Sequence, residues 1–237
     1  MENYTAETLP GGTRVYINKN HRFGTDAMLL AHFSNIRRDE TGCDLGTGCG
    51  VIPLKWRDAG HKGVSVGVDI NAETIQLFEL AIKDNGFFNT QAVCEDMRTW
   101  KTPETFDVVT CNPPYFTGGY ISPNPQKATA RHEVSCSMEE IAQTATRLLQ
   151  DGGRFCICQR PERLTDVLYA MRTNKIEPKH IRFVKQRSND ETPWLVLVDG
   201  RKGGKAGLHF AKDLIMEKQD GSFSDEVLKI YGKEVKL

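Results

Sequence analysis

The sequence predicts an α/β fold with a seven-stranded, mainly parallel sheet, helices on both faces and one antiparallel strand. Short apolar runs alternate with helical patterns of about 10–15 residues, and this alternation is typical of βαβ units. The last two apolar runs are separated only by "RSNDETP". Such a short connection suits an antiparallel pair, because a parallel pair needs a longer crossover.

Each element follows from its own pattern. The predicted strands are residues 41–45, 64–70, 91–96, 106–111, 154–159, 180–186 and 194–200. The predicted helices are residues 51–60, 71–86, 137–153 and 163–174. The second helix begins at the capping residue Asn71 and ends at Gly86. Its residues Ile75, Phe78 and Ile82 recur at helical spacing, so one face of this helix is expected to be buried.

Length and composition predict an ordinary globular protein. The chain has 237 residues, of which 39% are hydrophobic and 26% charged, and this suits one domain of the larger kind. We expect residues 1–35 to form an N-terminal extension and helix, and residues 36–237 to form the core and a C-terminal tail. The N-terminus is polar and no apolar run approaches about 18 residues, so we expect a cytoplasmic protein without a membrane segment.

Charge and cysteine content identify no partner by themselves. The 31 basic and 31 acidic residues cancel over the whole chain. Between Arg154 and Lys212, however, there are 13 Lys/Arg and 6 Asp/Glu. That excess is compatible with a polyanionic substrate, and equally with a solvated surface. The seven cysteines lack paired zinc-type spacing, so we expect reduced thiols and no metal site.

A glycine-rich turn follows the first predicted strand of the sheet. It contains Gly46, Gly48 and Gly50, and Asp69 ends the next strand, at a spacing suited to binding the ribose of a nucleoside cofactor. The dinucleotide fingerprint G-x-G-x-x-G needs its third glycine one residue later. The carboxylate of Asp44 also favours a cationic cofactor over a pyrophosphate. These features favour S-adenosylmethionine (SAM), with a nicotinamide cofactor or a purely structural turn as alternatives.

Two further strand ends carry polar side chains at the edge where α/β sheets bind ligands. Asp96 ends the third strand, where it either accepts from the adenine amine of the cofactor or caps a turn. The fourth strand ends in "NPPY". Asn112 and Pro113 offer two carbonyl acceptors side by side, and Tyr115 offers a ring on which a planar group can stack.

This pair of acceptors suits methylation of a planar nitrogen. An exocyclic amine is a poor nucleophile, because its lone pair is delocalised into the ring. Two acceptors that bind its hydrogens favour a pyramidal nitrogen and free the lone pair for attack on a methyl group. Such catalysis needs positioning and electrostatics, with no covalent intermediate and no general base before attack.

Taken together, these motifs resemble the Rossmann-like class I SAM-dependent methyltransferases that carry an N/D-P-P-Y/F/W motif. The chain is most similar to the small bacterial tRNA1(Val) adenine-N6 methyltransferases, which act on the adenine just 3′ of the anticodon. Segments that match that family occur in its order: "FGTDAMLLAHF", "DLGTGCGVIPL", "VDIN", "NPPYF", "ARHE", "VLVDGRKGGKAGL" and "DGSFSDEVLKIYG".

The resemblance implies roles for individual residues and a tRNA partner. Asn112, Pro113 and Tyr115 would be catalytic. Cofactor contacts would come from Thr25 and Asp26 near the methionine end, and from Asp44, Gly46, Gly48, Asp69, Ile70, Asp96, Met97 and Asn112. Substrate contacts would come from Phe116, Arg131, Lys202 and Lys205. Three of these residues also have structural interpretations. Arg131 can form an ion pair that caps the next helix, and Lys202 and Lys205 can belong to an ordinary exposed hairpin turn.

Other functions remain open at this point. A release-factor glutamine N5-methyltransferase also uses NPPY, but only 43 residues precede Asp44, which leaves little room for that family's N-terminal domain. A guanine-N2 RNA methyltransferase uses a similar acceptor pair. An oxidoreductase would need a different glycine spacing, and a SAM-binding regulator would have no use for Asn112 beside Pro113. We expect a monomer that acts on the N6 of an adenine in the anticodon loop of tRNA(Val).

Overall fold

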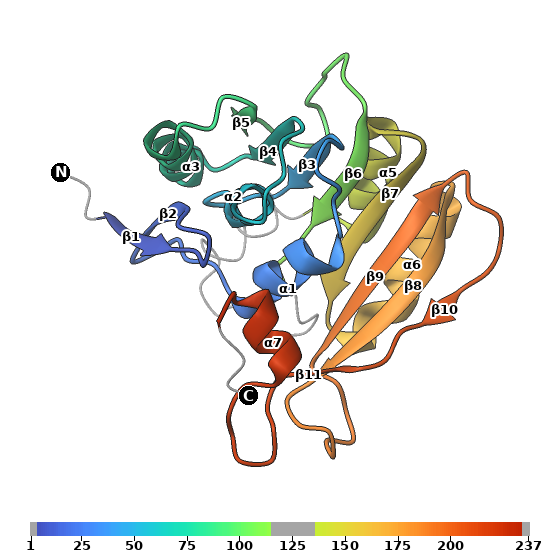
Figure 1. The fold of residues 1–237 in the computed structure, drawn as a ribbon. Helices are drawn as coiled ribbons and strands as arrows, with labels where there is room; N and C mark the ends of the chain where they lie inside the picture. Colours follow the sequence, from blue (N-terminus) through green and yellow to red (C-terminus); the bar gives the residue numbers. More distant parts are fainter. Residues whose placement is uncertain (1–3, 115–135, 234–237) are drawn as a thin grey trace, which may run out of the picture.

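The computed structural model describes residues 4–114 and 136–233, and its centre is one large twisted sheet (Figure 1). The strand order is β10-β8-β9-β7-β6-β3-β4-β5, with β11 also paired to β8. The strands of this sheet are β3 (Gly42–Leu45), β4 (Ser65–Asp69), β5 (Thr90–Cys94), β6 (Phe106–Cys111), β7 (Leu149–Gln159), β8 (Ile176–Lys185), β9 (Leu195–Lys202), β10 (His209–Phe210) and β11 (Leu214–Ile215). The helices are α1 (Thr25–Phe33), α2 (Val51–Asp58), α3 (Ala72–Asn85), α5 (Met138–Leu148), η1 (Pro161–Arg163), α6 (Leu164–Thr173) and α7 (Asp225–Ile230).

The predicted sheet is confirmed, including its reversed strand. β9 is antiparallel to both of its neighbours, β7 and β8, while β7, β6, β3, β4 and β5 pair in parallel. Two short strands, β10 and β11, extend the β8 edge in parallel. A separate hairpin of β1 (Tyr4–Thr8) and β2 (Arg14–Asn18) precedes α1. The hairpin, β10, β11 and α7 were not predicted.

The largest differences from the predicted boundaries are at the junction of α5 with β7 and at the start of β8. α5 ends at Leu148, because Leu149 already pairs with Phe106 as part of β7. β8 begins at Ile176, four residues earlier than predicted, and includes Pro178. The ladder with β9 shifts register between Pro178 and His180, as expected where proline cannot donate a hydrogen bond.

The helices cover both faces of the sheet, and β7 shows how the faces separate. Its residues Cys156 and Cys158 pack in the core that contains α1, α2 and α3. Its residues Phe155 and Ile157 pack in the other core, with α5 and α6. Alternate residues of a strand point to opposite faces, so each strand contributes to both cores. In the part of the chain that the structure describes, no helix is long and apolar enough to cross a membrane.

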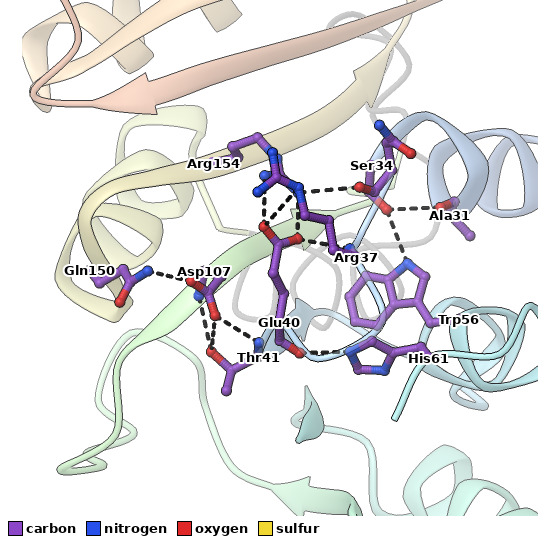
Figure 2. A network of polar contacts seen from close by, with 11 residues as sticks. Ala31, Ser34, Arg37, Glu40, Thr41, Trp56, His61, Asp107, Gln150 and Arg154 are labelled. Atoms are coloured by element: carbon purple, nitrogen blue, oxygen red, sulfur yellow. Dashed lines mark hydrogen bonds and ion pairs between the residues drawn. The ribbon is translucent and has the colours of Figure 1, made fainter. Parts of the chain in front are cut away.

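Polar contacts secure the segment 34–41, which connects α1 to β3 at the amino edge of the sheet (Figure 2). Arg154 of β7 donates to both carboxylate oxygens of Glu40, at 3.1 and 2.8 Å. The carboxylate of Asp107 accepts from the main-chain N–H and the hydroxyl of Thr41, at 2.8 and 2.9 Å. These contacts tie the segment to β6 and to the middle of β7.

The pair formed by Glu40 and Arg154 gives a pH-dependent part of the stability. Burial alone would raise the pKa of Glu40, but hydrogen bonds from Arg154 and from the Arg37 main chain outweigh it and lower the pKa below its usual value of 4.5. The stabilisation is therefore complete above about pH 4.5 and is lost as the pH falls through the lowered pKa. We expect Glu40→Gln to reduce the free energy of unfolding by about 1–3 kcal/mol at pH 7, and by less in acid. Urea denaturation at both pH values measures this, with Glu79→Gln on the exposed face of α3 as control. Equal stability of Glu40→Gln and wild type at pH 7 would contradict the expectation.

Candidate active site

A cavity of about 210 Å³ opens at the carboxyl ends of β3, β4, β5 and β6. It brings together seven of the residues that the sequence analysis singled out. The lining residues are Leu45, Gly46, Asp69, Ile70, Glu95, Asp96, Met97, Arg98, Cys111, Asn112, Pro113, Pro114, Cys136 and Ile141. Among the described residues, no group of three or more His, Cys, Asp or Glu side chains is arranged to hold a metal ion.

The three glycines of the turn after β3 serve two different purposes. Gly46 and Gly48 have positive φ angles of 69° and 55°. A Cβ at Gly48 would have no atom within 4 Å, and one at Gly46 would meet only the methyl of Met97 at 3.7 Å. The first two glycines therefore border open space. A Cβ at Gly50, in contrast, would lie 2.0 Å from the ring of Phe78, so this glycine makes room for the core.

Asp69 is held rigidly at the end of β4. Its Oδ2 accepts from the main-chain N–H of Gly48 at 2.8 Å, and its Oδ1 accepts from that of Asn71 at 2.9 Å. A carboxylate has about four lone-pair sites, so these two bonds orient the group and leave it able to accept from a ligand. The contact between Asp69 and Gly48 also joins the glycine turn to β4.

Asp44 lies beneath the turn and is buried. The hydroxyl of Thr110 on the adjacent β6 donates to its Oδ1 at 2.6 Å. Burial raises the pKa of Asp44 to about 7, partly offset by Thr110 and by the hydroxyl of Thr47. The Thr47 hydroxyl is buried and close enough to this carboxyl to lower its pKa, but it makes no hydrogen bond of ordinary geometry with any described residue.

The raised pKa of Asp44 predicts an unusual pH dependence of stability. The carboxyl ionises near pH 3.8 when unfolded but near 7 when folded, so its contribution becomes more unfavourable as the pH rises between these values. We expect Asp44→Asn to be more stable than wild type by about 2–4 kcal/mol at pH 8, and equal to it near pH 4. Urea denaturation from pH 4 to 8 measures this. Asp151→Asn, at a fully exposed carboxylate, is the matched control. A constant difference across this range would contradict the expectation.

Asp96 has a partner that the sequence analysis missed. Arg98 donates to both of its carboxylate oxygens, at 2.6 to 3.0 Å, and lies 3.5 Å from Glu140 of α5. The hydrogen bonds from Arg98 lower the pKa of Asp96. The Asp96 side chain also accepts from the main-chain N–H of Arg98, as in a turn cap. Arg98 therefore joins the candidate site, and a contact between Asp96 and the adenine of a cofactor stays a prediction.

Asn112 follows β6 and is oriented by the neighbouring strand β7. The register pairs Cys111 with Ile157, so Asn112 and Cys158 are adjacent on the same face of the sheet. The thiol of Cys158 donates to Oδ1 of Asn112 at 3.0 Å, and Cys158 is completely buried. The sequence analysis expected only a reduced thiol here. The strand register reveals its contact.

Other predicted residues lie away from the cavity or outside the described residues. Thr25 and Asp26 begin α1, and neither lines the cavity. The Thr25 hydroxyl accepts from the hydroxyl of Tyr231 at 3.1 Å, and Asp26 accepts from the next main-chain N–H. The predictions for Tyr115, Phe116 and Arg131 lie outside the described residues.

Lys202 and Lys205 lie at the amino edge of the sheet, opposite Asn112. β9 runs antiparallel to β7, so its last residue, Lys202, is beside the start of β7. The ammonium of Lys202 donates to the carbonyl of Leu149 at 2.7 Å and lies 3.6 Å from Asp151. The structure therefore does not bring these two lysines to the cavity.

The positive excess between Arg154 and Lys212 is largely balanced by acids from elsewhere in the chain. Five of its cations pair with carboxylates outside that segment. The pairs are Arg154–Glu40, Arg182–Glu226, Lys185–Asp213, Arg187–Glu217 and Lys202–Asp151. Sequence charge alone therefore does not define a polyanion-binding face.

The sheet order, the glycine turn and the cavity at the carboxyl edge define a class I methyltransferase fold. Solved structures agree: a predicted O-methyltransferase, Atu636 from Agrobacterium tumefaciens, has a TM-score of 0.71 at 22% identity, covering 87% of this chain and 95% of that one. TYW2 from P. horikoshii in complex with MeSAdo has a TM-score of 0.61 at 14% identity, covering 86% and 73%. Residues 8–174 match the methyltransferase small domain family, and the chain belongs to it.

Curated relatives carry a more specific name. A tRNA1(Val) (adenine(37)-N6)-methyltransferase from Bacteroides fragilis (strain YCH46) is 28% identical over 140 residues, which are 57% of this chain and 59% of that protein. One of the same name from Phocaeicola vulgatus is 25% identical over 177 residues, or 74% and 75% of the two chains. The match to the first relative thus spans less than two thirds of its length.

Proposed function

We propose that this protein is a SAM-dependent N-methyltransferase that methylates the exocyclic N6 of an adenine in tRNA. One observation carries the proposal: Asn112 and Pro113 line the same cavity as Gly46 and Asp69. The acceptors for a target amine thus lie beside the residues suited to a nucleoside cofactor. We further propose that the whole chain forms a single methyltransferase domain and that the protein is cytoplasmic.

The cavity fits SAM, the cofactor that the fold and the family imply. Gly46 and Gly48 border space that a side chain would fill. Asp69 presents a fixed carboxylate for ribose hydroxyls. The buried Thr47 hydroxyl, which has no hydrogen-bond partner among the described residues, is a further polar group at the turn. Ile70 lines the cavity and is 48% exposed, so it offers apolar surface to a base. When bound, SAM supplies an electrophilic methyl group on a sulfonium.

The chain's own residues position the amine. The Asn112 carbonyl and the Pro113 main-chain carbonyl accept the two N–H bonds of the target nitrogen. Cys158 fixes the Asn112 amide so that Oδ1 keeps its direction. A carbonyl oxygen has two lone pairs, so Oδ1 can accept from both the thiol and the amine. The amine proton leaves after methyl transfer, so no side chain needs to remove it first.

The tRNA substrate is supported by the names of the curated relatives. An unpaired adenine also suits the site, because extruding a base from a stack costs a few kcal/mol and costs least when the base is unpaired. The finer proposal is the adenine 3′ of the anticodon in tRNA(Val). A guanine-N2 RNA target and a release-factor glutamine remain the alternatives, because both present a planar nitrogen to the same acceptors.

Methyl transfer from labelled SAM to unmodified bulk tRNA, followed by nucleoside mass spectrometry, tests the proposal. We expect N6-methyladenosine, and sequencing of the labelled tRNA then identifies the species and position. N2-methylguanosine would keep the mechanism and change the substrate. Label in a release-factor peptide but not in RNA would replace tRNA by protein. SAM binding without transfer to any of these would contradict the catalytic role.

A further inference from the structure

A second cavity, of about 550 Å³, lies along α5 on the face of the sheet that α5 and α6 cover. It shares Arg98 with the candidate cofactor cavity, and α5 lines both, with Ile141 in the first and Glu140 in the second. From there the cavity continues along α5 to Arg147 and to Lys175, which precedes β8 at the amino edge of the sheet. It therefore adjoins the candidate active site and extends away from it along one helix.

Positive charge predominates in the lining of this cavity. Its charged side chains are three cations, Arg98, Arg147 and Lys175, and one anion, Glu140. Arg98 is paired with Asp96 and lies 3.5 Å from Glu140, so these carboxylates offset its charge. Arg147 and Lys175 are both exposed, and neither forms an ion pair with a residue that the structure describes. Two cations of the lining are thus available to an anion.

Two main-chain carbonyls orient the guanidinium of Arg147. Its Nη1 donates to the carbonyl of Trp100 at 2.8 Å, and its Nη2 donates to that of Met97 at 2.9 Å. Both acceptors are neutral, so the charge of the guanidinium remains. A guanidinium has five N–H donors in a planar fork that matches phosphate oxygens, and these two bonds leave three donors for a ligand. A side chain that is already oriented loses little conformational freedom on binding.

Lys175 occupies a backbone position that is unfavourable for lysine. Its φ angle is +63°, in the left-handed region that glycine and asparagine adopt at low cost. The main chain is fixed here, because the N–H of Gly203 donates to the Lys175 carbonyl at 2.9 Å. The ammonium group makes no hydrogen bond or ion pair within the described ranges of the chain. No contact of the ammonium in those ranges accounts for a lysine at this position, whereas an anion in the cavity does.

The chemistry of the lining favours a phosphate backbone over a free nucleotide. Besides its charged groups, the described lining has three threonines and the amides of Gln143 and Asn174, and it has no aromatic residue. It therefore offers charge and hydrogen bonds, but no ring on which a base can stack. Glu140 and Arg147 are seven residues apart in α5, or about 10 Å along its axis, so the cavity suits an extended strand.

We propose that the cavity along α5 binds the phosphate backbone of the RNA that carries the target base, chiefly through Arg147 and Lys175. The inference rests on the proposed function and assigns the RNA a surface that the sequence analysis did not identify. Phosphate contacts orient a nucleic acid without reading its sequence, and their contribution to affinity falls as the salt concentration rises. The strand runs along α5 toward the carboxyl edge of the sheet, where Asn112 lies.

Binding of unmodified tRNA over about 50–200 mM salt tests the inference, with Lys175→Asn as the main variant. Asparagine removes the charge and tolerates the positive φ angle, so the fold is not weakened. We expect a Kd about 3- to 10-fold higher than that of wild type, and a salt slope that is smaller by about one. Lys83→Gln is the matched control. It removes an exposed lysine from α3, on the opposite face of the sheet, and should match wild type.

Arg147 provides a second test. Arg147→Gln should weaken tRNA binding, and Arg147→Lys, which keeps the charge, should weaken it less. Arg147 also supports the segment that contains Met97, so calorimetric binding of SAM is measured alongside. SAM binding by Lys175→Asn should equal that of wild type, which separates a lost RNA contact from damage to the cofactor site.

The outcomes separate the inference from the proposed function. If wild type methylates tRNA but Lys175→Asn keeps the Kd and the salt slope of wild type, the inference is wrong and the proposed function stands. If Lys83→Gln weakens binding as much as Lys175→Asn does, the effect is one of total charge and the cavity is not the phosphate site. If wild type neither binds nor methylates tRNA, the proposed function is wrong and the RNA contact with it.

Discussion

Replacing Asn112 by alanine is expected to reduce the rate of methyl transfer to tRNA by at least about 100-fold. The change removes one of two acceptors for the target amine, and a single preorganised hydrogen-bonding group in an active site is typically worth about 100- to 1,000-fold in rate. The buried thiol of Cys158 also loses its acceptor, Oδ1 of Asn112. Single-turnover rates at saturating SAM measure the effect on the chemical step.

Asn112→Asp is the matched variant for this prediction. It keeps an acceptor oxygen at the same position, and the thiol of Cys158 can still donate to it. We therefore expect Asn112→Asp to retain more activity than Asn112→Ala, with both proteins folded. An alanine variant that methylates tRNA as fast as wild type would rule out Asn112 as the group that positions the amine.

Replacing Gly50 by alanine is expected to destabilise the fold by about 3–5 kcal/mol. Two costs add at this position. The φ angle of +79° is strained for a residue with a Cβ, and that Cβ would lie 2.0 Å from the ring of Phe78. Phe78, a residue of α3, is completely buried in the core that α3 shares with α2, so the ring has little room to move. Urea denaturation at neutral pH gives the change in free energy of unfolding.

Gly48→Ala isolates the strain from the clash. Gly48 also has a positive φ, +55°, but a Cβ there has no atom within 4 Å. We expect Gly48→Ala to reduce the free energy of unfolding by only about 1 kcal/mol. Among the folded molecules of each variant, we expect Gly48→Ala to weaken SAM binding more than Gly50→Ala does. Equal losses of stability in the two variants would contradict the role given to Phe78.

The sequence was sufficient for the strands and helices that build the two cores, and insufficient for the peripheral elements. Helix 71–86 was predicted because its capping residue, its terminal glycine and its apolar face all indicate the same helix. Asn71 does cap α3, because its side chain accepts from the main-chain N–H groups of Glu73 and Thr74. All five residues of β1 are exposed, so that strand leaves no apolar pattern to detect. β10 and β11 have two residues each and depend on pairing with β8, which no local signal encodes.

The candidate site shows the same division. Gly46, Asp69 and Asn112 were predicted because each ends or follows a strand, and the carboxyl ends of parallel strands meet at one edge. Cys158 was missed because its contact with Asn112 joins two strands distant in sequence. Arg98 was missed because its pairing with Asp96, two residues away, depends on side-chain geometry, and its contact with Glu140 joins distant segments. Lys202 and Lys205 were assigned from charge and resemblance, and the direction of β9 places them at the amino edge of the sheet.

The reversed strand β9 places a second connection at the carboxyl edge of the sheet, apart from the segments that form the candidate cofactor site. In an all-parallel sheet the connection into the last strand would enter at the amino edge, on the side of the sheet opposite the candidate active site. Here the connection between β8 and β9 turns at the carboxyl edge, on the opposite side of β6 from the glycine turn. Under the proposed function, we expect changes of length or sequence in residues 186–194 to affect substrate selection while leaving the residues of the candidate SAM site in place. Exchanging that connection between relatives offers a route to altered specificity on a constant catalytic scaffold.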